Sequence, residues 1–133
     1  MNGKEAAQSI RSELKKHGYT SRDVSVKSHW TGVSIEVKTP SVSYRQVIDI
    51  VNAYDIFTYV RFADSMDREI GILAAKIIAG IDASGAYRVG SFQVTKTAST
   101  ARPLQLIDVD GPFGTVIDAH HPRDVAASIM KRM

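Results

Sequence analysis

The residues best suited to chemistry are histidines and aspartates towards the C-terminal end of the chain. His120 and His121 follow a segment that carries Asp118, and Asp108 and Asp110 lie on the segment before it. Imidazole and carboxylate groups together can ligate a metal ion, or act as a general base and its orienting partner. Adjacent histidines on an extended chain point to opposite sides, and no His-x-x-x-His or Glu-x-x-His spacing accompanies them. We therefore expect turn and helix-start residues here, with no metal site and no cofactor.

Other residue patterns that commonly carry catalysis are also missing from the sequence. The 133 residues include no cysteine, which excludes disulfides, thiolate nucleophiles and cysteine-ligated metal sites. The glycines fit neither a dinucleotide-binding fingerprint nor a phosphate loop, and no serine lies in a nucleophile elbow. Asp64, Asp67 and Glu69 begin a predicted helix, where the helix dipole favours carboxylates. We expect a protein that is not an enzyme, with a small metal-dependent hydrolase that uses Asp108, Asp118 and His120 as an alternative.

Basic residues near the N-terminus offer a different chemistry, the binding of phosphates or acidic surfaces. Lys4, Arg11 and Lys15 share one face of a predicted helix at spacings of seven and four residues. Each phosphate that such a face neutralises releases counterions, which favours binding to nucleic acid. Glu5 and Glu13 dilute the charge, so a solvated helix face explains the same pattern. The candidate residues for binding nucleic acid or another partner are Lys4, Arg11, Lys15, Lys16, Arg22, Lys27 and Trp30.

Trp30 is the single tryptophan of the chain, and it lies beside His29 in a predicted hairpin turn. An exposed tryptophan in such a turn can stack on a base or anchor a protein partner. Tryptophan is usually mostly buried, so we favour the expectation that Trp30 folds back over the edge of the core. Trp30 can serve as a binding residue only if its side chain is exposed.

The N-terminal part of the chain has the clearest structural periodicity. Asn2, with Glu5 three residues later, predicts a capped helix over residues 3–17. Apolar residues alternate with polar ones over residues 24–27 and 33–38, which predicts two strands joined in a hairpin. A second capping pattern, Ser43 with Gln46, predicts a further helix over residues 44–54.

The remaining residues predict alternating strands and helices. Residues 56–62 are rich in β-branched and aromatic types and predict a strand, with a continuing helix as the alternative. Apolar spacing then predicts a helix whose buried face includes Met66, Ile70, Leu73, Ile77 and Ile78. The other expected elements are the end of that helix before residues 82–85, a strand over 87–95 with Gly90 as a bulge, a hairpin of 104–109 with 113–119, and a last helix from Pro122.

Length and composition predict a single α+β domain over residues 1–133, with residues 1–55 as a helix–hairpin–helix portion and 56–133 continuing the same core. Hydrophobic residues make up 44% and charged residues 23%, as in ordinary globular proteins. We expect one antiparallel or mixed sheet with helices mainly on one face. No apolar run is long enough to cross a membrane, and the lack of cysteine fits a cytoplasmic location.

The N-terminal part carries a recognisable series of features. They are the Ile10-Arg11 and Leu14-Lys15 pairs of the first predicted helix, the predicted strands Val24–Lys27 and Val33–Lys38, Pro40, and a helix ending at Tyr54. In these features it resembles a family of short modules found in large polyvalent proteins of phages and conjugative elements, the large polyvalent protein-associated domain 29. The resemblance covers roughly residues 3–55, about two-fifths of the chain. It implies a phage or mobile-element setting and an accessory role, and it supplies no catalytic residues.

Together these patterns and the resemblance predict a non-enzymatic accessory protein that contacts nucleic acid or a host protein through its basic helix face. The alternative is an inhibitor or interaction protein that acts on a host defence component through an apolar sheet face or edge. The net charge of +3 permits an acidic partner without requiring one. We expect no membrane partner, and the sequence leaves the oligomeric state open.

Overall fold

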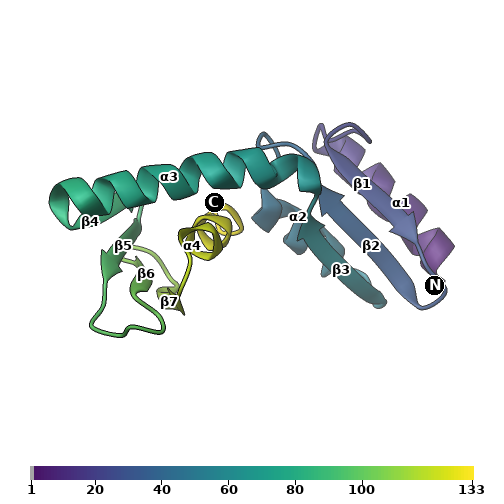
Figure 1. The fold of residues 1–133 in the computed structure, drawn as a ribbon. Coiled ribbons are helices and arrows are strands. Elements are labelled where there is room, and N and C mark those ends of the chain that lie inside the picture. The colour runs from purple at the N-terminus through teal and green to yellow at the C-terminus, as the bar shows by residue number, and fades with distance from the viewer. Residues whose placement is uncertain (1) are drawn as a thin grey trace. The chain divides into compact units, whose positions relative to one another are not determined.

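A computed structural model describes residues 2–133, and over this range the chain is α+β (Figure 1). Its strands form two sheets, whereas the sequence predicted one. The first sheet is mixed, with the order β1-β2-β3, and the second is antiparallel, with the order β4-β5-β6-β7. The elements are α1 (Gly3–Lys16), β1 (Val24–Ser28), β2 (Gly32–Val37), α2 (Tyr44–Val51), β3 (Phe57–Phe62), a 3₁₀ turn η1 (Asp64–Met66), α3 (Asp67–Ser84), β4 (Ala86–Val89), β5 (Phe92–Lys96), β6 (Leu104–Asp108), β7 (Gly114–Ala119) and α4 (Pro122–Met130).

The chain divides into two compact units, each with one of the sheets. The first unit runs up to Asp67 and includes Met133, and the second is Arg68–Arg132. The strand expected over residues 56–62 is present as β3, Phe57–Phe62, but it pairs with β2 and so completes the sheet of the first unit. The prediction that residues 1–133 form a single domain stays a prediction.

Helix α1 begins and ends where its sequence signals lie. The Asn2 side chain accepts a hydrogen bond from the Glu5 backbone N–H at 2.9 Å and donates one to the Glu5 carboxylate at 3.1 Å, which confirms the capping box. The side chains that α1 buries are those with the predicted helical spacing. They are Ala6, Ala7, Ile10 and Leu14.

Helix α2 is capped as predicted, but it ends at Val51 and not at residue 54. The Ser43 hydroxyl accepts from the Gln46 backbone N–H at 3.2 Å. The Gln46 side chain does not return this bond; it contacts His17 and Tyr19 instead, at the end of α1. The second capping residue therefore links the two helices of the first unit.

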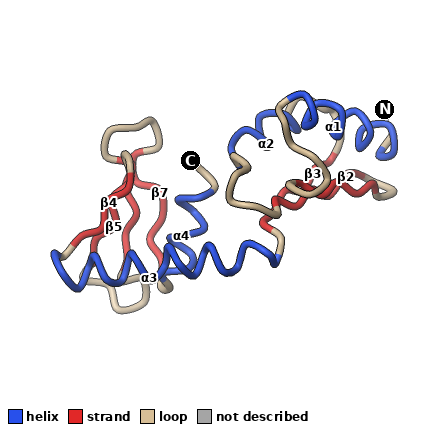
Figure 2. Tube along the Cα trace, turned by 90° about the horizontal axis from the view of Figure 1, so that it is seen from above, coloured by secondary structure: helices blue, strands red, loops and turns tan. Residues whose placement is uncertain are grey.

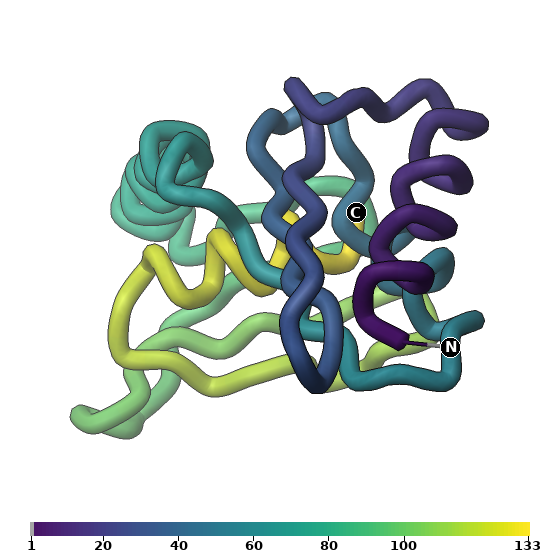
Figure 3. The backbone as a smooth tube through the Cα atoms, turned by 90° about the vertical axis from the view of Figure 1, so that its right-hand side faces the viewer, coloured from purple at the N-terminus to yellow at the C-terminus, as the bar shows by residue number. Residues whose placement is uncertain are grey.

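Both helices of the first unit lie on the same face of its sheet (Figures 2 and 3). The strands alternate in burial, so that every second side chain points into the space under the helices. In register across β1 and β2, Val26 faces Ile35 and Val24 faces Val37. Strand β3 runs parallel to β2, which requires a crossover connection, and α2 supplies it.

The second unit packs α4 against β6 and β7, and Gly80 of α3 against Tyr87 of β4. Asp108 is buried at the end of β6, where its carboxylate accepts from the Phe113 backbone N–H at 3.1 Å. Gly111 lies so close to this carboxylate that a Cβ there would overlap it. The β6–β7 turn is therefore built around a buried carboxylate.

Three predictions about the second unit are wrong in detail. Helix α3 continues to Ser84 and does not stop before Asp82, since Gly85, with φ +82°, provides the left-handed residue that follows it. Ile78 is 47% exposed, because the buried face follows the regular helical phase of Ile70, Ala74, Ile77 and Ile81. The expected strand 87–95 is a hairpin of β4 and β5, with Gly90 at φ +58° in its two-residue turn.

Within residues 2–133, no helix has the length and apolar character that a membrane span requires.

Gly32, at the start of β2, should be intolerant of substitution. A Cβ there would overlap the backbone carbonyl of Phe57, its register partner in β3. We expect Gly32→Ala to lower the free energy of unfolding by about 1–3 kcal/mol, because neither strand can move without repacking the core. Urea denaturation followed by circular dichroism would measure it.

The neighbouring substitution Thr31→Ala is the control, since Thr31 is exposed in the same turn. It should change the free energy of unfolding by less than about 0.5 kcal/mol. Equal stability of the two variants would contradict the close packing of β2 against β3.

Candidate nucleic-acid and partner interface on the first unit

Among the described residues, no helix of the first unit packs on the outer face of the β1-β2-β3 sheet (Figure 2). The side chains of this face alternate along each strand with the buried ones. The register of the three strands aligns them in rows across the sheet. One row is Lys27, Ser34 and Tyr59, and the next is Ser25, Glu36 and Arg61. The sheet thus presents a mixed polar and aromatic surface.

Three large aromatic side chains are exposed on or beside this face. Phe57 and Tyr59, two residues apart on β3, are 69% and 54% exposed. Trp30 in the β1–β2 turn is 98% exposed, so the expectation that it folds over the core is wrong. The first turn of α1 packs closely against the β1–β2 turn through Gly3, where an added Cβ would overlap the His29 and Gly32 carbonyls.

The polar groups of this face form two short networks. A His29 ring nitrogen lies 2.6 Å from the Ser34 hydroxyl, and Arg61 forms an ion pair with Glu36 at 2.7 Å. Lys27 is exposed on the same face. A shallow groove of about 260 Å³ runs between these networks. It is lined by Ser25, Lys27, His29, Ser34, Glu36, Tyr59 and Arg61. We call this surface the open face.

Buried contacts under β3 hold the aromatic residues of the open face in place. The Tyr44 hydroxyl of α2 donates to the Val60 carbonyl at 2.7 Å, and its ring lies 4.7 Å from that of Phe62. Burial raises the pKa of the Tyr44 hydroxyl above its usual value, and the nearby charge that Tyr59 would carry adds to this rise in pKa. Tyr44 therefore anchors the strand that presents Tyr59.

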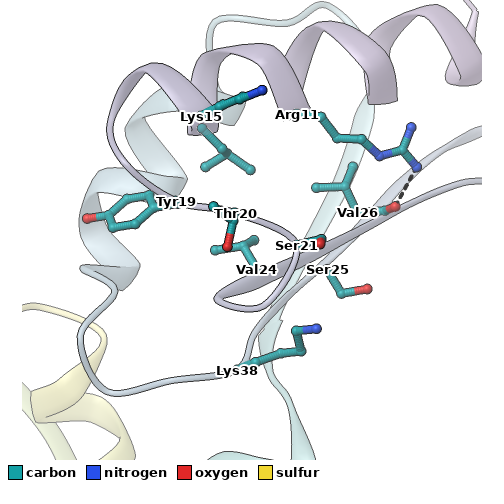
Figure 4. Close-up of a pocket in the computed structure, with 10 residues that line it drawn as sticks. Arg11, Lys15, Tyr19, Thr20, Ser21, Val24, Ser25, Val26 and Lys38 are labelled. Carbon is teal, nitrogen blue, oxygen red and sulfur yellow. Dashed lines mark hydrogen bonds between the residues drawn. The ribbon is translucent and has the colours of Figure 1, made fainter.

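A second concave surface lies on the other side of β1, between this strand and α1 (Figure 4). Arg11 and Lys15 of α1 and Lys38 after β2 surround it, and the Arg11 guanidinium donates to the Val26 carbonyl at 2.7 Å. The cavity has a volume of about 630 Å³. Its lining is Arg11, Leu14, Lys15, Tyr19, Thr20, Ser21, Val24, Ser25, Val26 and Lys38. We call it the edge cleft.

The seven candidate residues do not form one patch. Arg11 and Lys15 line the edge cleft, whereas Lys27 lies on the open face, across β1 from them. Lys16 is paired with Glu13 at 3.0 Å. Lys4 and Arg22 are exposed and line neither surface.

Sequence reasoning missed four residues that the fold adds to these surfaces. Lys38 reaches the edge cleft only because β2 returns beside β1, and Phe57, Tyr59 and Arg61 reach the open face only because β3 pairs with β2. For Phe57, Tyr59 and Arg61, the available signal was that they are alternate residues of a predicted strand. This pattern does not reveal which strand pairs with that strand.

In the second unit, the residues of the hydrolase alternative are not brought together. Asp108 is buried at one end of the β6–β7 ladder, and Asp118 is exposed near the other, where it accepts from Gln105 at 3.2 Å. A ring nitrogen of His120 lies 3.0 Å from the Ala101 carbonyl. Over residues 2–133, no group of three histidine or carboxylate side chains is arranged to hold a metal ion.

Comparisons with protein-family models, curated proteins and solved structures found no match to this chain. The resemblance of residues 3–55 to the polyvalent-protein module stays a prediction.

Tyr44→Phe should reveal the anchoring of β3 through its pH dependence. Removing the hydroxyl leaves the Val60 carbonyl without its donor, so we expect a loss of about 1 kcal/mol in the free energy of unfolding at pH 7. In the wild type the folded pKa lies above the unfolded one. The stabilisation is therefore complete below about pH 10 and is lost as the pH rises through the folded pKa.

Urea denaturation at several pH values would measure both effects. The variant should lose less stability than the wild type as the pH is raised above about 10. Two pH profiles that run parallel throughout would show that Tyr44 does not anchor the strand in this way.

Proposed function

We propose that the first unit binds single-stranded nucleic acid across the open face of its sheet. The observation that carries this proposal is the exposure of Trp30, Phe57 and Tyr59, three aromatic side chains on or beside one uncovered sheet face. Isolated exposed apolar residues are common, but three large rings together are costly to leave in water without a use.

Aromatic rings on a sheet are stacking platforms for unpaired bases. Phe57 and Tyr59 are neighbours on the same face of β3, about 6.6 Å apart along the strand. This spacing allows two bases of an unstacked strand to lie on them in succession. Base–aromatic stacking contributes about 1–3 kcal/mol per base and tolerates any sequence.

The charges of the open face suit a phosphate backbone. Glu36 is the one carboxylate that lines the groove, and its ion pair with Arg61 screens its negative charge. Lys27 remains to contact phosphate, and the cations of the edge cleft lie just across β1. The overall charge of +3 adds a weak long-range attraction for a polyanion.

The proposal includes a non-enzymatic accessory role in a phage or mobile element. Its support is the resemblance of residues 3–55 to the polyvalent-protein module, together with the separation of Asp108, Asp118 and His120 described above. The basic face of α1 contributes through Arg11 and Lys15, which lie across β1 from the open face, while the open face provides the principal contact.

Substitution of Tyr59 tests the stacking. We expect Tyr59→Ala to weaken binding of a short single-stranded oligonucleotide about 5- to 150-fold, the equivalent of one lost stacked base. Tyr59→Phe keeps the ring and should bind nearly as the wild type. Trp30 is the only tryptophan, so quenching of its fluorescence can follow the titration without a label.

If the wild type binds neither DNA nor RNA single strands at low ionic strength, the proposed function is wrong. If Tyr59→Ala and Tyr59→Phe bind the oligonucleotide with equal affinity, the binding site is not the open face.

Salt dependence tests the phosphate contact of Lys27. For a single strand, each phosphate contact contributes about −0.7 to the slope of log affinity against log salt concentration. Lys27→Ala should therefore make that slope about 0.7 less steep. Lys76→Ala, which removes an exposed lysine from α3 in the second unit, is the matched control and should leave the slope unchanged. A slope equally affected by both would indicate that only net charge matters.

A further inference from the structure

The outer edge of β1 forms one wall of the edge cleft. In the strand order β1-β2-β3, β1 is an edge strand, and within residues 2–133 no strand pairs with its outer side. Helix α1 stands over this edge and provides the opposite wall (Figure 4). An edge strand beside a helix is a place where an extended peptide can add to a sheet.

The register of the hairpin shows which main-chain groups point to this edge. His29 N–H donates to the Gly32 carbonyl at 2.7 Å and Lys38 N–H to the Asp23 carbonyl at 2.9 Å. In an antiparallel pair, residues alternate between bonding the partner strand and pointing away from it. Ser25 and Lys27 therefore bond β2, and the main-chain groups of Val24, Val26 and Ser28 point outward.

Two hydrogen bonds agree with this assignment. The Arg11 guanidinium donates to the outward-pointing Val26 carbonyl at 2.7 Å, and Val24 N–H donates to the Thr20 carbonyl at 3.0 Å. Arg11 thus occupies one acceptor of the edge, which protects it against pairing with other chains. The Val26 and Ser28 N–H groups remain directed at the cleft edge as donors for an incoming strand.

The positive charge of the cleft favours an acidic occupant. Arg11, Lys15 and Lys38 line it, and no carboxylate is among its lining residues. A second copy of this chain would bring an identical set of cations to the same place, and these would repel. An acidic partner gains ion pairs with all three cations.

The floor of the cleft favours a peptide over a small anion. Leu14, Val24 and Val26 are buried apolar side chains that line the cleft together with the cations, and we call them its floor. An extended peptide has side chains that alternate between its two faces, and those directed towards α1 meet both the apolar lining and the α1 cations. The aliphatic stems of glutamates in these positions can cover the apolar lining while their carboxylates pair with Arg11 and Lys15. A free phosphate would use only the charges.

We propose that an extended acidic segment of a partner protein adds to β1 as a fourth strand in the edge cleft. Its main chain bonds to Val26 and Ser28, and its acidic side chains pair with Lys15 and Lys38. Arg11 exchanges the Val26 carbonyl for a peptide carboxylate as the segment enters. The site is separate from the open face and does not depend on the nucleic-acid proposal.

The test uses the whole chain and a labelled peptide of alternating glutamate and valine. Fluorescence anisotropy should show binding of this peptide and none of the same peptide with lysine in place of glutamate. A version N-methylated at alternate residues, which cannot form one side of the ladder, should bind at least about tenfold more weakly. Amide NMR shifts should be centred on Val26 and Ser28.

Two variants with a matched control complete the test. Lys38→Glu should abolish binding, whereas Lys96→Glu, the same change on β5 in the second unit, should not affect it beyond the small effect of net charge. Ser28→Pro removes one outward donor without a charge change at an exposed edge position and should weaken binding. If Ser28→Pro fails to fold, the binding of the N-methylated peptide to the wild-type chain still tests whether the peptide forms main-chain hydrogen bonds with β1.

Several results would overturn the proposal. Equal binding of the methylated and unmethylated peptides would show a purely ionic contact, and NMR shifts confined to the open face would place the peptide elsewhere. An oligonucleotide that shifts Val26 and Ser28 while the peptide does not would make the edge cleft part of the nucleic-acid surface. Tyr59→Ala should leave peptide binding unchanged, so the two proposals fail independently.

Discussion

One-sided burial of the first sheet is the constraint on which the rest of the first unit depends. Val33, Ile35 and Val37 all point to one face of β2, and both α1 and α2 pack there. Because no helix of this unit remains for the opposite face, the other half of the alternation stays exposed. The buried face stabilises the unit, and the same alternation leaves Lys27 and Tyr59 exposed on the open face.

The charge distribution of the first unit follows from this geometry. Strand β1 separates two surfaces: the cations of α1 meet its buried side at the edge, and Lys27 points to the open face. Arg11, Lys15 and Lys38 therefore lie beside apolar side chains in the edge cleft, while Lys27 and the Glu36–Arg61 ion pair lie beside aromatic side chains on the open face. These are the surfaces proposed above for an acidic peptide and for an unpaired nucleic-acid strand.

In the second unit, a buried carboxylate organises a turn. Asp108 suggested catalysis by its proximity in sequence to other carboxylates and histidines, but its carboxylate is turned into the β6–β7 turn. Asp118 and His120 engage Gln105 and the Ala101 carbonyl. Buried polar groups require partners, and turns supply backbone N–H groups in large numbers.

The sequence by itself determined the local elements, because caps and apolar periods act between residues a few positions apart. The Asn2–Glu5 box, the 24–37 hairpin and the strand at 57–62 are all in place. Tertiary structure alone decided the division into two sheets, the exposure of Trp30, and the placement of Lys38 and Arg11 in the lining of one cleft. A two-residue period specifies which side chains share a face of a strand, but strand partners and uncovered faces depend on long-range packing that no local pattern encodes.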